Sequence, residues 1–494
     1  MNLNNDNLNN FSHNRDDHYK DIADDIFRCI EDFSNREELI SFYQYFVNQY
    51  QLPQSVIKTK LCQHLANSYQ LKKGKFHNSL LLWRLPLYFF YYGMLFYGIF
   101  FSKGRLKSPS KFDLIIDGIN QPIEVNRFEK LLKIFGKNNV LLISQNADLT
   151  PNFPEYLFIN KKPFRGIFFI DIVISIFKEF FLGVWISIIA SIRVKANLLP
   201  ISIRIIHDYL SYKTIFKSYS ASYLIQERHY STNPIKNYLF KKYGGLSSAT
   251  IQKNIFQFDP IFYYMDIDLF LTLGTSGYEN FLSYGGRIDK LEPVGSLFME
   301  YYFCDLKQNS INEKYDLLIL GINVSKAFDR LDSYSNFMSD YYSLFKWAAQ
   351  LSLAYPDVKI GLIHHSNAKK DEIEDKILSG SNVVILDKNL NSYIAAFSSK
   401  YAITYGSTMG YELNAHGLKT YFIDPDYRCS FLPLKGQEHI DSLRITSFAD
   451  FQSLVDKINN GKVFGEKLSY FDSSLWCLES SNVSGLIYKK LLSN

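Results

Sequence analysis

From residue 112 onward, short apolar strands alternate with helical stretches, and this alternation restricts the fold more than any other feature of the chain. The expected strands lie at 112–117, 139–144, 223–226, 247–252 and 268–274, and then at 315–321, 358–365, 382–387, 401–406 and 420–425. Strands that alternate with helices form parallel sheets with right-handed crossovers. A hinge-like segment at 295–312 separates the two sets. We therefore expect an α/β fold of two Rossmann-like domains facing a cleft, with ligands at the carboxyl ends of the strands.

The distribution of charge indicates a further division of the chain. The net charge is +5, but residues 51–250 contain 27 Lys and Arg against 10 Asp and Glu, and residues 51–112 contain no acidic residue. Such a stretch favours an anionic partner, either phospholipid headgroups or nucleic acid. We expect a disordered tail at 1–20, a helical, basic, membrane-associating region at 21–110, a Rossmann-like domain with an amphipathic insertion at 111–300, and a second Rossmann-like domain at 301–494.

The most apolar run, residues 79–101, is just long enough to cross a bilayer, which takes about 20 apolar residues. Arg84 and Pro86 near one end, the frequent Tyr and the basic flanks favour instead a helix that lies in the membrane interface. A membrane span and a buried core helix are the alternatives. A second apolar segment, residues 166–192, is interrupted by charged residues and indicates a packed or interfacial helix.

The cysteines and the N-terminus indicate the compartment. The 5 cysteines form no CxxC pair and have no zinc-site spacing, which fits a reduced cytoplasmic protein. Residues 1–20 are polar and Asn-rich and lack the apolar core of a signal peptide. We expect a peripheral protein on the inner face of the cell membrane. Nucleic acid is disfavoured as a partner because the basic residues surround aliphatic and aromatic runs instead of a polar groove.

The segment 405–417 contains the strongest candidate binding motif, at a point where a strand ends and a helix begins. Gly406 permits a tight turn, and Ser407 and Thr408 are suited to cap the helix and leave backbone N–H groups for an anion. Glu412 lies one turn into the helix, where a carboxylate on the cleft side can accept from a ribose diol. Gly417 is suited to end the helix. Plain helix capping with a solvated Glu412 is the alternative.

The string STMGYELNAHGLKTYFIDP, residues 407–425, resembles the nucleotide-sugar motif of the GT-B glycosyltransferases of bacterial capsule and surface-polysaccharide synthesis. A second similarity places His365 where capsule polymerases and teichoic acid glycerophosphotransferases have a strand-terminal His-Pro, although Ser366 replaces the proline here. A weaker similarity covers 268–296. The resemblance spans residues 224–433, and only 405–425 is specific.

The resemblance implies a transfer of sugar from a nucleotide whose leaving phosphate needs preorganised donors. The helix start at 406–408, the loop at Gly321 and His365 would supply these donors without a metal ion or cofactor. The acceptor hydroxyl needs a general base, for which Glu227 is the best local candidate, with His229 as its partner or as an acceptor ligand. Arg228 would then contact an anionic acceptor. A solvated surface loop is the alternative interpretation of 226–229.

The function expected from these features is a metal-independent glycosyltransferase, with a nucleotide-sugar donor and a glycan or lipid-linked acceptor at the inner membrane leaflet. The domain at 111–300 would bind the acceptor and the domain at 301–494 the donor. A glycerophosphotransferase or nucleotide-sugar epimerase of the same fold, or a non-catalytic membrane scaffold, are the alternatives. Two DxD strings occur at chance frequency, and P-loop, HExxH, GxSxG and strand-linked GxGxxG motifs are absent from the sequence.

Overall fold

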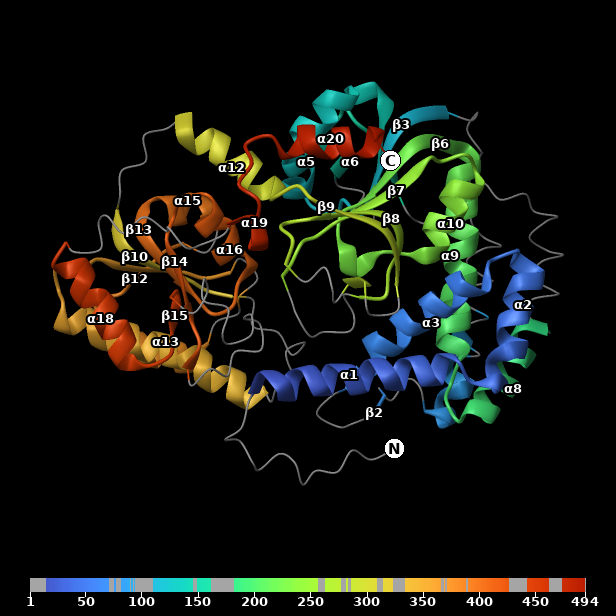
Figure 1. Ribbon diagram of the computed structural model, residues 1–494, viewed down its shortest axis with the longest axis horizontal. Helices are drawn as coiled ribbons and strands as arrows, with labels where there is room; N and C mark the ends of the chain where they lie inside the picture. The colour runs from blue at the N-terminus through green and yellow to red at the C-terminus, as the bar shows by residue number, and fades with distance from the viewer. Residues whose placement is uncertain are drawn as a thin grey trace.

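The computed structural model of the chain describes residues 15–70, 75–76, 81–88, 90–91, 93, 110–144, 149–160, 182–255, 263–276, 281–282, 286–308, 314–322, 334–365, 368, 371–387, 390–425, 442–461 and 473–493. Within these ranges the chain forms two parallel sheets covered by helices, and the sheets lie at two separate places along the long axis of the molecule (Figure 1). A short antiparallel pair, β1 (Tyr69–Gln70) with β2 (Lys75–Phe76), accompanies them.

The first sheet has 7 strands, all parallel to their neighbours. Their spatial order is β5 (Leu157–Asn160), β4 (Val140–Ser144), β3 (Ser110–Asp117), β6 (Tyr219–Gln226), β7 (Ser247–Ile251), β8 (Asp266–Thr272) and β9 (Arg287–Pro293). Strands β4, β7 and β8 are buried along their whole length, as expected for strands of a parallel sheet with both faces covered. Strand β9 is charged and partly exposed and forms one edge.

The second sheet has 6 strands and is also entirely parallel. Their order is β12 (Val384–Ile385), β11 (Ile360–Ile363), β10 (Tyr315–Leu320), β13 (Ser399–Thr404), β14 (Thr420–Ile423) and β15 (Arg444–Ile445). The central strand β10 pairs with β11 on one side and β13 on the other, so the carboxyl ends of all three meet at one edge. This edge contains Gly321, His365 and the turn before α16 (Thr408–Ala415).

All strands expected from the sequence are confirmed, and so is the division into two Rossmann-like sets. The structure adds β5, β9 and β15 to the two sheets, as well as the pair of β1 and β2, and the sequence pattern did not reveal these strands. Strand β9 has the sequence RIDKLEP, which lacks the apolar run of a buried strand because it lies at the sheet edge. The expected strand at 382–387 is reduced to the two exposed residues of β12.

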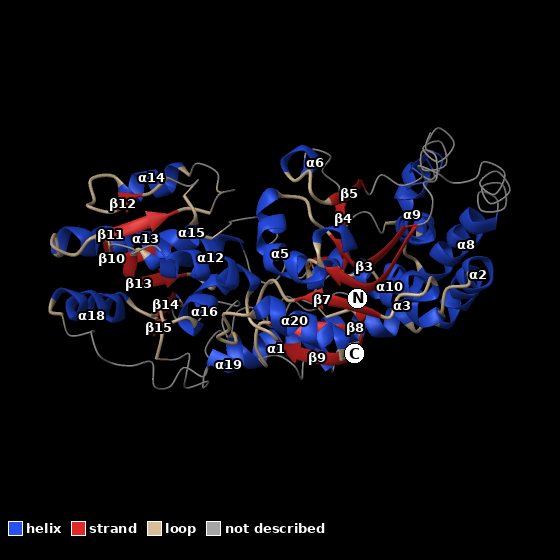
Figure 2. Ribbon diagram, turned by 90° about the horizontal axis from the view of Figure 1, so that it is seen from above, coloured by secondary structure: helices blue, strands red, loops and turns tan. Residues whose placement is uncertain are grey.

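Helices pack on both sheets (Figure 2). Those near the first sheet are α5 (Pro122–Phe135), α6 (Leu149–Asn152), α9 (Leu199–Ser218), α10 (Pro234–Lys242) and α20 (Val483–Leu492), and those near the second are α13 (Tyr334–Ala354), α14 (Glu372–Leu378), α15 (Ser392–Phe397), α16 and α18 (Phe448–Asn459). Helices α5 and α18 begin with capping boxes, at Gln121 and Ser447 respectively. In each box two backbone donors at the helix start are satisfied reciprocally.

The N-terminal helices α1 (Arg15–Ser34), α2 (Ile40–Tyr50) and α3 (Gln54–Ser68) share one apolar core with the first sheet and with α8 (Val184–Val194). A buried ion pair at 2.8 Å joins Lys60 of α3 to Asp208 of α9. The helical character expected for 21–70 is therefore present, and these helices form an integral part of the first domain. Whether the region 21–110 associates with a membrane stays a prediction.

Several expected segments lie partly outside the described residues. Helix α1 begins at Arg15, inside the tail expected at 1–20, and residues 1–14 are not described. The apolar run 79–101 is described only at 81–88, 90–91 and 93, where Trp83 and Phe90 are 69% and 63% exposed. The segment 166–192 is described only from residue 182. Among the described residues, no helix combines the length and apolarity needed to traverse a bilayer.

The chain passes between the two domains twice, at neighbouring places. It leaves the first sheet after β9 through α12 (Leu297–Gln308), and it returns through α19 (Ser473–Trp476) to α20, which packs on α5 (Figure 1). The return segment is held by the first domain, because the Leu478 N–H donates to the Leu273 carbonyl at 2.8 Å. Gly295, with φ of +85°, lies so close that a β-carbon there would be 2.5 Å from the Leu478 carbonyl oxygen.

Candidate functional site

The carboxyl ends of β3, β6 and β7 are adjacent in the first sheet, and polar side chains follow them. Glu227 comes directly after β6, and its N–H donates to the Asp117 carbonyl at the end of β3, at 3.0 Å. Lys253 follows β7 by two residues, and its backbone N–H donates to Nδ1 of His229 at 3.2 Å. The parallel register of the three strands therefore brings Glu227, His229 and Lys253 together.

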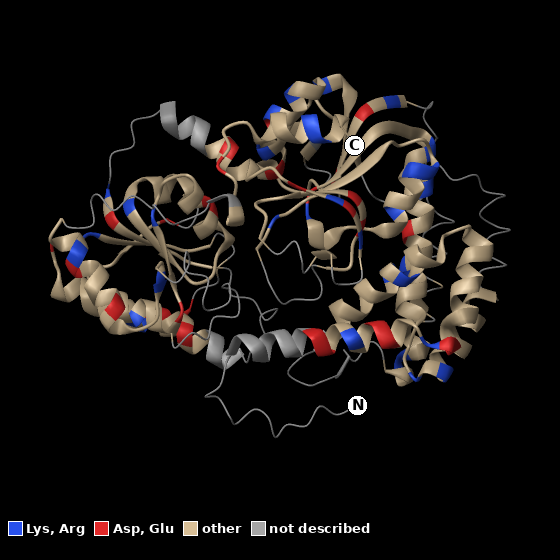
Figure 3. Ribbon diagram, viewed as in Figure 1, with Lys and Arg blue, Asp and Glu red and all other residues tan. Residues whose placement is uncertain are grey.

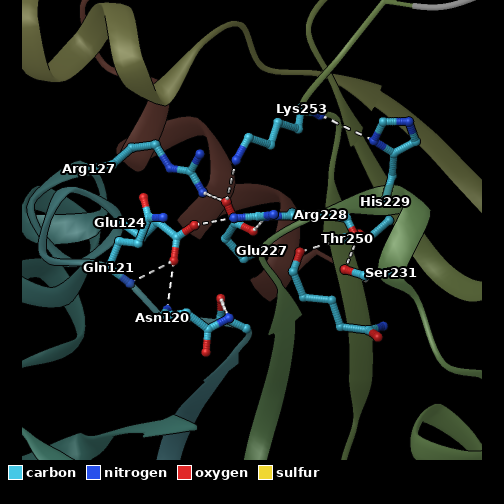
Figure 4. A network of polar contacts seen from close by, with 12 residues as sticks. Asn120, Gln121, Glu124, Arg127, Glu227, Arg228, His229, Ser231, Thr250 and Lys253 are labelled. Carbon is cyan, nitrogen blue, oxygen red and sulfur yellow. Dashed lines mark hydrogen bonds and ion pairs between the residues drawn. The ribbon is translucent and has the colours of Figure 1, made fainter. Parts of the chain in front are cut away.

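Glu227 is the centre of a cluster of charges (Figure 4). Its Oε1 is 2.7 Å from Nη2 of Arg127, a residue of α5, and 3.5 Å from Nζ of Lys253. Arg228 pairs with the other oxygen of Glu227 and with Glu124. Three cations thus face two carboxylates, which leaves one excess positive charge at this edge of the sheet. Lys253 and Arg228 are the members that reach solvent, with side chains 23% and 30% exposed.

The environment of Glu227 disfavours the general-base role predicted for it. Burial alone would raise the pKa of Glu227, but Arg127, Lys253 and Arg228 outweigh burial and lower it. The side chain is 1% exposed and already accepts from its cationic neighbours. A carboxylate with a lowered pKa and no exposed surface is a poor proton acceptor for a substrate. It is well suited to hold Arg127, Arg228 and Lys253 in place.

His229 is fully buried and packs in parallel against Phe270, with ring centroids 5.6 Å apart. Burial lowers the pKa of His229 to about 3, so the ring is neutral near pH 7. Because its Nδ1 accepts from the Lys253 backbone, His229 fixes the path of the chain after β7. The structure therefore gives His229 a positioning contact to the Lys253 segment, and its roles as partner of Glu227 or as acceptor ligand stay predictions.

The turn before α16 has the conformation expected from its sequence. Gly406 has φ of +64°, which a side chain would disfavour. Ser407 is the N-cap, and its Oγ accepts from the Met409 N–H at 3.3 Å. The hydroxyl of Thr408 accepts from the Ile255 N–H of the first domain at 3.0 Å. Since Ile255 lies two residues after Lys253, the start of α16 is held close to the charged cluster.

The structure differs from the sequence prediction at Glu412. Its side chain does not face an open groove but is buried, 3% exposed, and both oxygens accept from hydroxyl groups of the protein. Ser296 Oγ donates to Oε1 at 2.5 Å, and Tyr393 Oη donates to Oε2 at 2.6 Å. Burial raises the pKa of Glu412, and the two hydroxyl donors partly offset this effect. The carboxylate of Glu412 thus connects α16 to Ser296, which precedes α12, and to Tyr393 of α15. A ribose could contact Glu412 only by displacing these two hydroxyl donors.

His365 and Gly321 lie at the carboxyl ends of the neighbouring strands β11 and β10. Burial and the nearby charge of Lys253 lower the pKa of the half-buried His365. Gly321 lies against β11, where a β-carbon would be 3.0 Å from the Ile363 carbonyl and 3.2 Å from the His364 backbone. Gly321 thus allows the close approach of the two strand ends, and the charge of Lys253 disfavours the protonated form of His365.

The structure therefore brings together most of the residues predicted from the sequence. Glu227, His229 and Lys253 lie together, and the start of α16 is bonded to Ile255 just beyond them, whereas Glu412 is turned into the domain junction. The charge of Lys253 also acts on the pKa of His365. Sequence reasoning missed Lys253 and Arg127. Lys253 follows the predicted strand 247–252 and could have been found by the rule that selected Glu227, since both end adjacent strands. Arg127 lies inside a predicted helix and gave no such signal.

The described acidic residues of the two DxD strings pair with arginines, and Asp426 lies outside the described residues. Arg287 binds both Asp266 and Asp268, at 2.7 and 3.1 Å, and Arg444 binds Asp424 at 2.5 Å. Over the part of the chain that the structure describes, no group of three or more His, Cys, Asp or Glu side chains is arranged to hold a metal ion. The proposed absence of a metal or cofactor stays a prediction.

Comparisons with known proteins agree with the architecture. The sequence matches no protein-family model and no curated protein. Among solved structures, the chain is similar to UDP-GlcNAc 2-epimerase from Neisseria meningitidis bound to UDP-GlcNAc, with a TM-score of 0.50 and 10% identity over 78% of this chain and 100% of the other. The chain has the GT-B fold. The wall teichoic acid polymerase TagF also matches, with a TM-score of 0.45 and 11% identity over 83% of this chain and 97% of the other.

Proposed function

We propose that this chain is a nucleotide-sugar-dependent glycosyltransferase that extends a surface polysaccharide or lipid-linked glycan at the inner face of the cell membrane. The observation that carries the proposal is the excess positive charge around Lys253, placed between the strand ends of the first sheet and the start of α16. A leaving nucleoside phosphate develops negative charge, and preorganised cations and N–H donors at that position stabilise it. The motif at 405–425 supports the choice of a nucleotide donor.

Lys253 is the cation best placed to contact the donor phosphates. Its Nζ is 3.5 Å from Glu227, longer than the 2.7 Å contact of Arg127, so it is the less tightly held of the two. Burial lowers the pKa of Lys253, while Glu227 acts in the opposite direction. Its charge also acts on His365 and Glu412 in the second domain. A phosphate between the domains would therefore contact Lys253 from one side and the N-terminal end of α16 from the other.

The test is a nucleotide panel of UDP, CDP, GDP and CMP, scored by the shift in melting temperature of the full chain. Binding adds RT ln(1 + [L]/Kd), about 2.7 kcal/mol at a hundredfold excess over Kd, which gives a clear shift. Lys253→Met should raise the Kd of the nucleotide that gives the shift by about tenfold or more, because a hydrogen bond to a charged group contributes about 1.5–3 kcal/mol. Lys400→Met is the matched control, because Lys400 is 30% exposed and pairs with Asp316 at 2.7 Å, remote from the cluster.

The outcomes separate the proposal from its alternatives. No shift with any nucleotide would refute a nucleotide-dependent function. If the Lys253→Met variant shows the same nucleotide-induced shift in melting temperature, the charged cluster around Glu227 is not part of the nucleotide site. If a nucleotide sugar is consumed without an acceptor and an epimeric sugar forms, the chain is an epimerase. Release of CMP from CDP-glycerol would indicate a glycerophosphotransferase.

A further inference from the structure

Helix α8 is apolar on most of its surface, so it leaves large apolar side chains exposed as well as burying others. The face that packs on the protein contains small and hydroxyl residues: Val184, Ser187, Ala190, Ser191 and Val194 are all buried. The opposite face contains the largest apolar residues, and Leu182, just before the helix, Trp185 and Ile192 are 52%, 60% and 59% exposed. A helix on the surface of a soluble domain normally buries its apolar face.

Hydrogen bonds fix α8 in this orientation. The hydroxyl groups of Ser187 and Ser202 are 2.7 Å apart, and Ser202 belongs to α9. Ser191 Oγ donates to the Ser187 carbonyl and accepts from the Leu198 N–H at 2.8 Å. The inward hydroxyl groups are therefore satisfied, and their small size allows α8 and α9 to pack closely. The outward direction of Trp185 and Ile192 follows from this packing.

Basic residues lie at the C-terminal end of α8, beside the exposed Glu37 and Glu38 of the short helix Glu37–Leu39 that contacts it. Arg193 and Lys195 follow Ile192 in the sequence and are exposed. Arg36 is exposed as well, and its Nη1 donates to the Val194 carbonyl at 3.3 Å, which places it at the C-terminal end of α8. The sequence of α8 contains no acidic residue. Figure 3 shows further basic positions along α9, on the same outer side of the first domain.

These features favour a lipid surface over a protein partner. Trp is enriched where a bilayer meets water, and a helix with an apolar face and flanking Arg or Lys lies in the interface plane. Anionic headgroups attract such basic residues. Helix α8 lies beside α2 at the end of the molecule farthest from the second sheet, so a bilayer there would not obstruct the second domain (Figures 1 and 2).

We propose that the outward face of α8, defined by Leu182, Trp185 and Ile192, docks on an anionic phospholipid bilayer. Arg193 and Lys195 contact the headgroup phosphates, and the apolar side chains enter the upper acyl region. This inference rests on the proposed function and deepens it, because it assigns the membrane contact to α8. The sequence had favoured the run 79–101 for this contact, and it had indicated a packed or interfacial helix for 166–192, which includes most of α8.

The test is sedimentation of the full chain with vesicles of phosphatidylcholine, with and without phosphatidylglycerol, and without any nucleotide. The variant Trp185→Ser/Ile192→Ser should lower the vesicle partition coefficient by about tenfold or more. The control variant Leu353→Ser/Ile373→Ser removes two apolar residues of similar exposure, 57% and 56%, from the second domain and should bind as the unaltered chain does. All four positions are exposed, so both variants should keep the melting temperature.

A charge variant and a measurement of oligomeric state by light scattering complete the test. Arg193→Glu/Lys195→Glu should reduce binding to vesicles that contain phosphatidylglycerol, and it should abolish the difference between the two lipid compositions. Equal partition of the unaltered chain and Trp185→Ser/Ile192→Ser would overturn the proposal. The proposal would also be overturned if the unaltered chain is a dimer and Trp185→Ser/Ile192→Ser is a monomer with unchanged vesicle binding. The outward face of α8 would then bind a second copy of this chain. Neither result bears on nucleotide binding, which the melting assay tests separately.

Discussion

Replacing Glu227 with glutamine separates two roles for this residue, an anchor for cations and a general base. Glutamine keeps the shape of the side chain but removes the charge that faces Arg127, Arg228 and Lys253. The side chain of Glu227 is 1% exposed and that of Arg127 is 3% exposed. Removing one partner from a buried ion pair costs about 3–5 kcal/mol, because the remaining charge stays buried without compensation.

The matched control is Glu129→Gln, on the same helix as Arg127. Glu129 pairs with Lys133 at 2.6 Å, but these side chains are 46% and 59% exposed. An exposed pair of this kind contributes about 0–1 kcal/mol. Urea unfolding followed by circular dichroism should therefore show a free energy of unfolding lowered by about 3–5 kcal/mol in Glu227→Gln and nearly unchanged in Glu129→Gln.

The pH dependence gives an independent check. Because the folded-state pKa of Glu227 is lowered, its contribution to stability is present above the unfolded pKa near 4.5 and is lost as the pH falls below that value. The variant Glu227→Gln should lack this part of the acid dependence. The anchor role is refuted if Glu227→Gln costs no more than Glu129→Gln. Loss of the proposed transferase activity with unchanged stability would then support the base role.

Three further predictions concern other parts of the site. Tyr393→Phe removes the donor 2.6 Å from Oε2 of Glu412 and should lower the free energy of unfolding by about 1.5–3 kcal/mol, and an unchanged urea midpoint would contradict this. Gly410→Ala places a β-carbon 2.6 Å from the Phe422 ring and should cost about 1–3 kcal/mol, measured by thermal melting, so a melting temperature equal to that of the unaltered chain would count against the packing described. With a pKa of about 3, the His229 ring should show no NMR titration between pH 5 and 8, and a midpoint in that range would disprove its buried neutral state.

The sequence was sufficient to predict the two parallel sheets because their central strands are buried on both faces and read as continuous apolar runs. Strand β9 escaped prediction because an exposed edge strand has no such run. Neither could the sequence show that α8 points its apolar residues outward. Periodicity reports two faces of a helix, and only tertiary contacts such as Ser187 with Ser202 decide which face is covered.

The candidate site was predictable where local chemistry decides it. The turn at Gly406 and the cap at Ser407 follow from residue preferences and are present in the structure. The partners of Glu412 come from distant parts of the chain, so helix periodicity alone placed its carboxylate wrongly at an open surface. Arg127 was missed because charged residues are seldom fully buried, and its partner Glu227 lies 100 positions away.

The double passage of the chain between the domains limits how they can move. The outgoing segment at Gly295 and the returning segment at Leu478 touch, so both covalent links lie at the same place. Two bodies joined there can rotate about an axis through the contact but can scarcely slide or separate. A small rotation about this contact would displace the start of α16 relative to Lys253, so opening over a ligand would require both the Gly295 and the Leu478 segments to adjust and the hydrogen bond between Ile255 and Thr408 to break.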